Sequence, residues 1–214
     1  MARDMLDTTI SDSRTVSDSP TQVWALWVVA NAMGSAAMWA LCWQVIPPGY
    51  PTGLVLAVAQ SIVLSLWLRS SGPWLLGTTF GIALASAATG VVLAVYGPGL
   101  VWWRSGLPAG AEGAAITLLP ALTFGLVLGV IQWMILRQVS PRAIWWVIAS
   151  MLGWCASELL HPESILIHYW LDTPLLWHVI TDPLSRAMTG LMLGMAYAGP
   201  TGLTLAFLLG RRER

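Results

Sequence analysis

The sequence predicts an all-α integral membrane protein whose six transmembrane helices form three repeated helical hairpins. The first observation is composition: 57% of the 214 residues are hydrophobic and only 9% are charged, far below the roughly 25% charged residues of soluble domains, and the mean hydropathy is +0.71. The second is that apolar segments of about 20 residues, the length that crosses the hydrocarbon core, recur along the chain. The third is that two short phrases each return three times.

Turn-forming residues divide the apolar part into six predicted spans, at 23–46, 52–69, 74–96, 114–137, 143–160 and 184–210. Pro47, Pro48 and Pro51 separate the first pair, and Ser140 with Pro141 separates the fourth span from the fifth. Residues 1–22 mix Asp, Ser and Thr and are predicted to form a disordered cytoplasmic tail. The transmembrane domain then covers residues 23–210, with outer loops at 97–113 and 161–183 and a basic cytoplasmic end at 211–214.

Arginine placement predicts the orientation, because basic residues are retained in cytoplasmic loops. With six spans, eight of the ten basic residues fall on the side of the two termini, which we therefore expect to be cytoplasmic: Arg3, Arg14, Arg69, Arg137, Arg142, Arg211, Arg212 and Arg214. Arg104 and Arg186 fall on the opposite side with all three histidines. The net charge is zero and lysine is absent, so the basic patch of a nucleic-acid-binding protein is missing.

Most of the 14 tryptophans lie where a predicted span meets a loop. Such positions favour tryptophan because its ring is apolar while its N–H needs water or a headgroup. We therefore expect two aromatic belts, with Trp24, Trp27, Trp67, Trp74, Trp145 and Trp146 inside and Trp39, Trp43, Trp102, Trp103, Trp170 and Trp177 outside. Trp133 and Trp154 lie deeper in their spans.

The repeated phrases divide between odd and even spans. The odd spans share W-x-x-[AG]-[NTS]-x-x-G, as "WVVANAMG" from Trp27, "WLLGTTFG" from Trp74 and "WVIASMLG" from Trp146. The even spans share a GLxL[GA] phrase that begins at Gly53, Gly125 and Gly190. Self-similarity of this kind predicts three copies of one supersecondary unit, here a two-helix hairpin.

Both phrases predict close packing between helices. Small residues let helix backbones approach within a bilayer, and Gly53 with Ala57, Gly125 with Gly129 and Gly190 with Gly194 are small residues four apart. A polar residue follows seven positions after the first glycine, about two turns on and therefore on the same stripe, as Gln60, Gln132 and Tyr197. The odd spans place Asn31, Thr78 and Ser150 beside their own small residues.

Two explanations of these intramembrane polar residues remain open. In the first, each amide hydrogen-bonds across a helix contact and adds about 0.6 to 2 kcal/mol. In the second, Asn31, Gln60, Thr78 and Gln132 line a pore or a ligand pocket, together with Trp133 and Tyr197. No Asp, Glu, Lys or Arg lies at the centre of a predicted span, which argues against a proton-coupled transporter or an ion pump.

The phrases "GLVLGVIQWMILRQVSPRAIWWVIASMLGW" and "AYAGPTGLTLAFLL" resemble a family of uncharacterised bacterial polytopic membrane proteins, frequent in filamentous phototrophic bacteria. Its members repeat G-x-x-Q-W-x-x-L-R and R-A-x-W-W-V-x-A-x-x-L-G-W helical hairpins and end on T-G-L-x-L-x-x-L-L. The resemblance is close over residues 125–154 and at the C-terminus, degenerate over the first three spans and absent from the outer loops. It implies a multi-pass protein of the bacterial cytoplasmic (inner) membrane, and it supplies no catalytic residue.

The second outer loop contains every candidate metal ligand. Its histidines pair with carboxylates at helical spacing, as Glu158 with His161, His168 with Asp172 and His178 with Asp182. Such pairs suit zinc or iron, and the histidines could also ligate a pigment. One Glu-x-x-His motif is weak evidence, since di-iron bundles need two. The alternative is a solvated loop in which Asp172 and Asp182 cap short helices.

Three function classes follow from these patterns. The preferred one is a non-enzymatic membrane protein that serves as a structural or accessory subunit, or that binds lipid or another apolar ligand. The second is a channel or facilitator lined by Asn31, Gln60, Thr78 and Gln132. The third is a metal-dependent membrane enzyme that uses the outer loop. Membrane lipids are the expected partners, with other membrane subunits or a second copy of the chain as further candidates.

Overall fold

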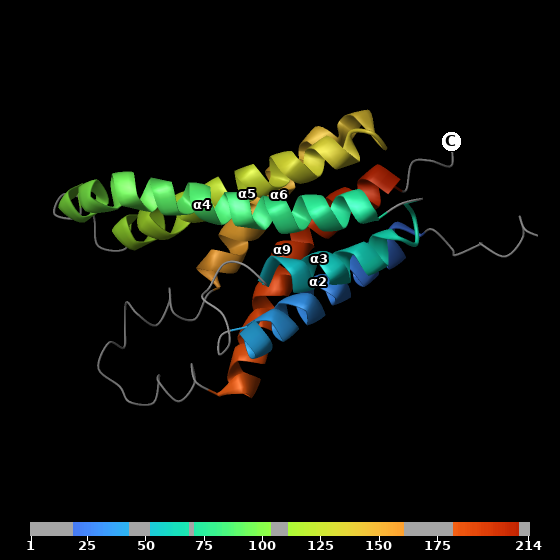
Figure 1. Ribbon diagram of the computed structural model, residues 1–214, viewed down its shortest axis with the longest axis horizontal. Helices are drawn as coiled ribbons and strands as arrows, with labels where there is room; N and C mark the ends of the chain where they lie inside the picture. The colour runs from blue at the N-terminus through green and yellow to red at the C-terminus, as the bar shows by residue number, and fades with distance from the viewer. Residues whose placement is uncertain (1–18, 43–51, 69–70, 104–110, 161–181, 210–214) are drawn as a thin grey trace, which may run out of the picture.

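A computed structural model describes residues 19–42, 52–68, 71–103, 111–160 and 182–209, which are helical apart from turns (Figure 1). The helices are α2 (Pro20–Cys42), α3 (Thr52–Leu64), α4 (Gly72–Trp103), α5 (Ala111–Leu136), the 3-10 helix η1 (Pro141–Ile144), α6 (Trp145–Leu159) and α9 (Pro183–Leu209). The predicted all-α membrane fold is confirmed in that α2, α4, α5 and α9 each contain a segment long and apolar enough to cross a bilayer. Helices α3 and α6 have only 13 and 15 residues.

The helix bounds differ from the predicted spans at the N-terminus, at the end of α3 and at the first outer loop. Helix α2 begins earlier than predicted, at Pro20, because proline suits a first helical position and the Ser19 hydroxyl accepts a hydrogen bond from the Gln22 N–H at 3.2 Å. Helix α4 runs on to Trp103 and α5 begins at Ala111, so both helices enter the segment predicted as the loop 97–113. Helix α3 ends at Leu64 rather than at residue 69.

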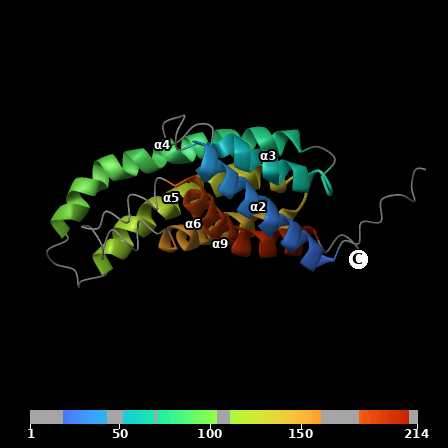
Figure 2. The same cartoon turned by 90° about the horizontal axis from the view of Figure 1, so that it is seen from below.

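The helices form a closed ring in chain order, in which α2 packs on α3, α3 on α4, α4 on α5, α5 on α6, α6 on α9 and α9 on α2. Figures 1 and 2 both show α4 and α5 side by side, with the last part of α4 and the first part of α5 extending beyond the other helices. We call the end at which α2, α4 and α6 begin the starting end of the bundle. The largest buried apolar cluster lies there, and its members come from α2, α3, α4, α5, α6 and α9.

Glycines bring α5 and α6 into backbone contact. A Cβ added at Gly125 would lie 2.6 Å from the Met151 Cα, and one added at Gly129 would lie 3.1 Å from the Val147 Cα. The first distance is shorter than real Cβ contacts, and the second is tighter than nine in ten of them. The phrase that begins at Gly125 therefore packs against a helix and not against lipid, as the small-residue spacing predicts.

The contact between α2 and α9 is equally close. A Cβ at Gly190 would overlap the carbonyl oxygen of Ser35, and a Cβ at Gly194 would overlap the carbonyl oxygen of Asn31. A Cβ added at Gly53, the equivalent glycine in α3, would lie 3.0 Å from the Ile82 Cβ of α4. All three copies of the even-span phrase therefore begin with a glycine that faces another helix.

Candidate functional site

Three indole rings meet inside the starting end of the bundle. Trp27 of α2, Trp74 of α4 and Trp146 of α6 are fully buried, and their ring centroids lie 5.9, 5.6 and 5.5 Å apart in edge-to-face pairs. This geometry is favourable because the positive edge of one ring faces the negative face of the next. The prediction that these three tryptophans belong to an interfacial belt is wrong, since no part of them reaches lipid or water.

The first hydrogen-bonded link joins α2, α3 and α4. The Gln60 amide donates from Nε2 to Asn31 Oδ1 at 2.8 Å, and Gln60 Oε1 accepts the indole N–H of Trp74 at 3.0 Å. Asn31 in turn donates from Nδ2 to the Trp27 carbonyl at 2.8 Å, one turn earlier in its own helix. Gln60 and Asn31 are fully buried, so the amides bond to each other and to an indole.

The second link repeats this pattern among α4, α5 and α6. Gln132 donates from Nε2 to the Thr78 hydroxyl at 3.1 Å, and its Oε1 accepts the indole N–H of Trp146 at 2.9 Å. Gln132 thus relates to Thr78 and Trp146 as Gln60 relates to Asn31 and Trp74. Gln132 and Thr78 are also fully buried.

The third link joins α6, α9 and α2 with different side chains. The hydroxyls of Ser150 and Tyr197 lie 3.3 Å apart, and the Tyr197 hydroxyl also donates to Gln132 Oε1 at 3.4 Å. The indole N–H of Trp27 donates to the Thr201 hydroxyl at 3.0 Å, which donates to the Tyr197 carbonyl at 2.8 Å. The hydroxyl of Tyr197, which stands at the glutamine position, is directed to Ser150 and Gln132. Thr201, one turn later, accepts the indole N–H instead.

Together these bonds close a circle around the three indoles. Each neighbouring pair of helices is joined by at least one buried side-chain bond, through the acceptors Asn31, Gln60, Thr78, Gln132, Tyr197 and Thr201 and the partner Ser150. We call this set, with the three indoles, the polar ring. Helical spacing builds it, because residues four apart share a face, as Trp27 with Asn31, Trp74 with Thr78 and Trp146 with Ser150 do.

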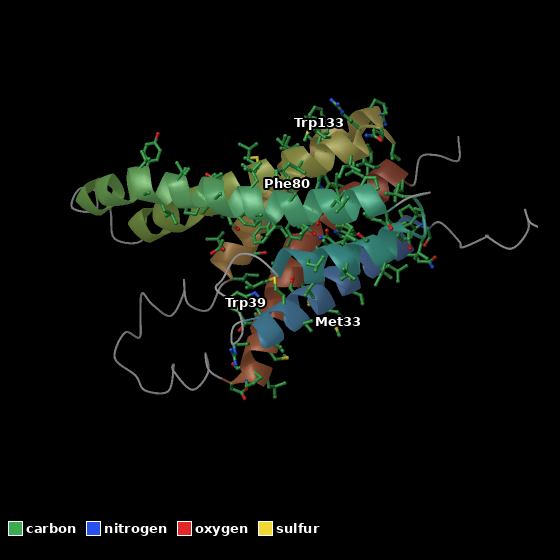
Figure 3. All side chains as sticks on the ribbon, in the orientation of Figure 1. Met33, Trp39, Phe80 and Trp133 are labelled. Atoms are coloured by element: carbon green, nitrogen blue, oxygen red, sulfur yellow. The ribbon has the colours of Figure 1, made fainter. Side chains whose placement is uncertain are left out.

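The residues predicted to line a pore or ligand pocket fall into the polar ring with one exception. Asn31, Gln60, Thr78, Gln132 and Tyr197 are brought together there. Trp133, a further candidate, is only partly buried and lies under Arg137, whose Cζ is 5.3 Å from its ring centroid. Figure 3 labels it on α5, and Met33 and Phe80, both largely exposed, mark the outer surfaces of α2 and α4.

Sequence reasoning missed Thr201 and the three central tryptophans as members of this site. The signal for the tryptophans was present, since each is the first residue of the odd-span phrase, at a fixed distance from a polar residue and a glycine. A belt residue needs no such fixed spacing. Thr201 carries no comparable signal, because the other two copies have no threonine in its role.

The metal candidates of the second outer loop fall mostly outside the described residues, where His161, His168, His178 and Asp172 lie. Of the two that the structure describes, Glu158 is partly buried near the end of α6. Asp182 caps α9, since its Oδ2 accepts the Ser185 N–H at 2.8 Å. The capping alternative is therefore confirmed for Asp182. Within the described ranges no three His, Cys, Asp or Glu side chains gather.

The chemistry of the polar ring is that of recognition between helices. Its members are amides, hydroxyls and indoles, none of which ionises near neutral pH. Each member bonds to another.

Comparison with protein-family models, with curated proteins and with solved structures gives no match to this chain.

Proposed function

We propose that the chain is a non-enzymatic, multi-pass protein of the bacterial cytoplasmic membrane that serves as a structural or accessory subunit. The observation that carries this proposal is the polar ring. Its amides form hydrogen bonds to partners within the protein, such as the Gln60 to Asn31 bond at 2.8 Å and the Trp146 to Gln132 bond at 2.9 Å. Such groups hold helices together, and they have little capacity left for a substrate or an ion.

The same geometry argues against a pore through the bundle axis. A conducting path needs polar groups that face water or the ion. Here the axis at the starting end is occupied by Trp27, Trp74 and Trp146, all fully buried and in mutual contact. The arrangement thus favours the first explanation of the intramembrane polar residues, in which they act as contacts between helices.

Six crossings built from three copies of a hairpin fit the same contacts. Each tryptophan lies near the start of its helix, and the three rings touch, so α2, α4 and α6 begin at one end of the bundle. Parallel odd helices require that α3 and α5 return the chain to that end. The arginine distribution then supports cytoplasmic termini. The resemblance to the repeated-hairpin family, which is close over residues 125–154 and at the C-terminus, supports the same proposal.

Reconstitution into liposomes tests the proposal. We expect the purified chain to stay in the membrane fraction after alkaline extraction. Liposomes that contain it should be no more permeable to ions, water and small solutes than protein-free liposomes are. Gln132→Leu should leave that permeability unchanged, because the side chain bonds to helices and lines no path. A solute flux that the wild-type chain supports and Gln132→Leu alters would favour the channel alternative instead.

Purification from native membranes separates the remaining forms of the proposal. An accessory subunit should copurify with a partner protein in a fixed ratio when it is extracted in a mild detergent. A binder of lipid or pigment should instead carry one small apolar molecule per chain, detected by mass spectrometry and by its absorption spectrum. A self-associating scaffold should elute as a defined homo-oligomer.

A further inference from the structure

Two exposed arginines flank the turn between α5 and α6 at the starting end of the bundle. Arg137 follows the last residue of α5, and Arg142 lies in η1. The Cζ of Arg137 lies 5.3 Å from the centroid of the Trp133 ring, and the Cζ of Arg142 lies 5.9 Å from the centroid of the Phe207 ring of α9. Each guanidinium is thus held over an aromatic face.

Neither guanidinium has an acidic partner or a hydrogen bond in the part of the chain that the structure describes. The hydrogen bonds of Arg142 use its backbone, since its N–H donates to the Ser140 hydroxyl at 3.4 Å and its carbonyl accepts the Trp145 N–H. A guanidinium stacked on a ring keeps its N–H edge available, and its planar fork matches the oxygens of a phosphate. The turn therefore presents two oriented phosphate-binding groups.

Apolar side chains continue from these arginines along α6 and α9. Ile144 of η1 and Ile148 of α6 are 51% and 46% exposed, and Leu203 and Phe207 of α9 are 63% and 41% exposed. The two helices are antiparallel neighbours, since the Ser157 hydroxyl donates to the Leu193 carbonyl at 2.9 Å while Arg142 stacks on Phe207. A ligand held at Arg142 would have an apolar surface beside it.

From this combination we propose that the Arg137–Arg142 turn binds the headgroup phosphate of an anionic phospholipid, with the acyl chains against α6 and α9. Arg142 is the principal phosphate ligand because its guanidinium, which lies in η1 and contacts Phe207 of α9, is next to the apolar surface. Arg137 adds a second positive charge on the other side of the turn. The inference rests on the proposed membrane insertion, and it names a specific lipid as a partner of the chain.

The test uses the full chain in nanodiscs of phosphatidylcholine with a minor fraction of phosphatidylglycerol. After extraction in a mild detergent, the lipids retained by the protein are counted by mass spectrometry. We expect phosphatidylglycerol to be enriched over the bulk mixture, and Arg142→Gln to reduce the enrichment about fivefold, the contribution of one arginine near an anionic surface. Phe207→Leu, which keeps the apolar side chain but removes the ring face, should weaken the enrichment in the same direction.

The matched control is Arg3→Gln/Arg14→Gln, which removes as much charge as Arg137→Gln/Arg142→Gln but lies in the N-terminal tail of the sequence. The enrichment should survive in the control and be lost in the turn variant. An equal loss in both variants, or no enrichment in the wild-type chain, overturns the proposal. If inorganic phosphate binds to the lipid-free protein in detergent with the same dependence on Arg142, the site takes free phosphate and the lipid assignment is wrong. Failure of the wild-type chain to enter the membrane fraction would instead refute the proposed function.

Discussion

Gln132 is the residue on which the polar ring depends most. Its side chain donates to Thr78 and accepts from Trp146 at 2.9 Å, so Gln132→Leu leaves a buried hydroxyl and a buried indole N–H without these partners. We expect a loss of about 1–3 kcal/mol in the free energy of unfolding, the cost of an unsatisfied buried group. Denaturant titration in detergent, followed by tryptophan fluorescence, measures it. Gln138→Leu, in the turn after α5, is the matched control and should change stability little.

Tyr197 should matter less through its hydroxyl than Gln132 does through its amide. The hydroxyl contacts are long, 3.3 Å to Ser150 and 3.4 Å to Gln132, and Gln132 retains its two shorter bonds when they are lost. We therefore expect Tyr197→Phe to cost less than about 1 kcal/mol, at the low end for a neutral hydrogen bond. The same titration checks it. A cost equal to that of Gln132→Leu would show that the long contacts are stronger than their lengths indicate.

At this scale the sequence predicted which polar residues lie on packing faces, but not which of them bond to one another or what they surround. Spacing placed Asn31, Gln60, Thr78, Gln132 and Tyr197 on packing faces, because helical periodicity fixes which residues share a side. It could not reveal that Trp27, Trp74 and Trp146 point to one another, since interfacial and central tryptophans are equally apolar. Whether a tryptophan is interfacial or central depends on how the helices cross in three dimensions, and the local pattern does not encode this crossing.

Glycine sets the distance between α2 and α9, and Gly194→Ala tests this at the scale of the helix pair. The new methyl group would overlap the backbone carbonyl oxygen of Asn31, so the helices must separate and strain the Asn31 to Gln60 bond. We expect a destabilisation of about 1–3 kcal/mol, as for overpacking in a closely packed core. The thermal unfolding midpoint in detergent should fall accordingly.

The control for this substitution is Gly90→Ala in α4, where nothing lies within 4 Å of the added Cβ. Alanine is the better helix former by up to about 1 kcal/mol, so this variant should be neutral or slightly stabilised. The pair thus separates crowding at a contact from the intrinsic propensity of glycine. A Gly194→Ala variant as stable as Gly90→Ala would contradict the close contact.

Helix lengths were the least predictable property at the scale of elements. Apolar residues continue past the ends of several helices, so hydropathy alone placed the end of α3 at residue 69, whereas the helix ends at Leu64 and a turn follows. For α4 the error runs the other way, since the helix continues to Trp103. The start of α2 could have been predicted from the sequence, because Ser19 is suited to cap the helix and Pro20 to its first position.

Across the whole molecule, the polar ring links every helix to the next and makes the bundle one unit. Two copies use the same set of bonds. In each, a glutamine accepts a hydrogen bond from an indole N–H of the following hairpin and donates one to a polar side chain of its own hairpin. The third uses Tyr197 and Thr201 in place of one glutamine. The third set therefore differs in its side chains but still joins its helices by buried hydrogen bonds.

The number of crossings distinguishes this arrangement from one in which only α2, α4, α5 and α9 span the membrane. With six crossings, residues 70 and 138 lie on the side of the termini and residue 105 lies opposite. With four, the short helices α3 and α6 stay on one side and all three positions are reversed. Single cysteines at Ser70→Cys, Gln138→Cys and Ser105→Cys, in a Cys42→Ser/Cys155→Ser background, should therefore react with an impermeant thiol reagent only at residue 105 in intact cells. We expect the first outcome, because parallel odd helices fit the contact among Trp27, Trp74 and Trp146. Labelling at residues 70 and 138 with protection at 105 would refute the six-span bundle.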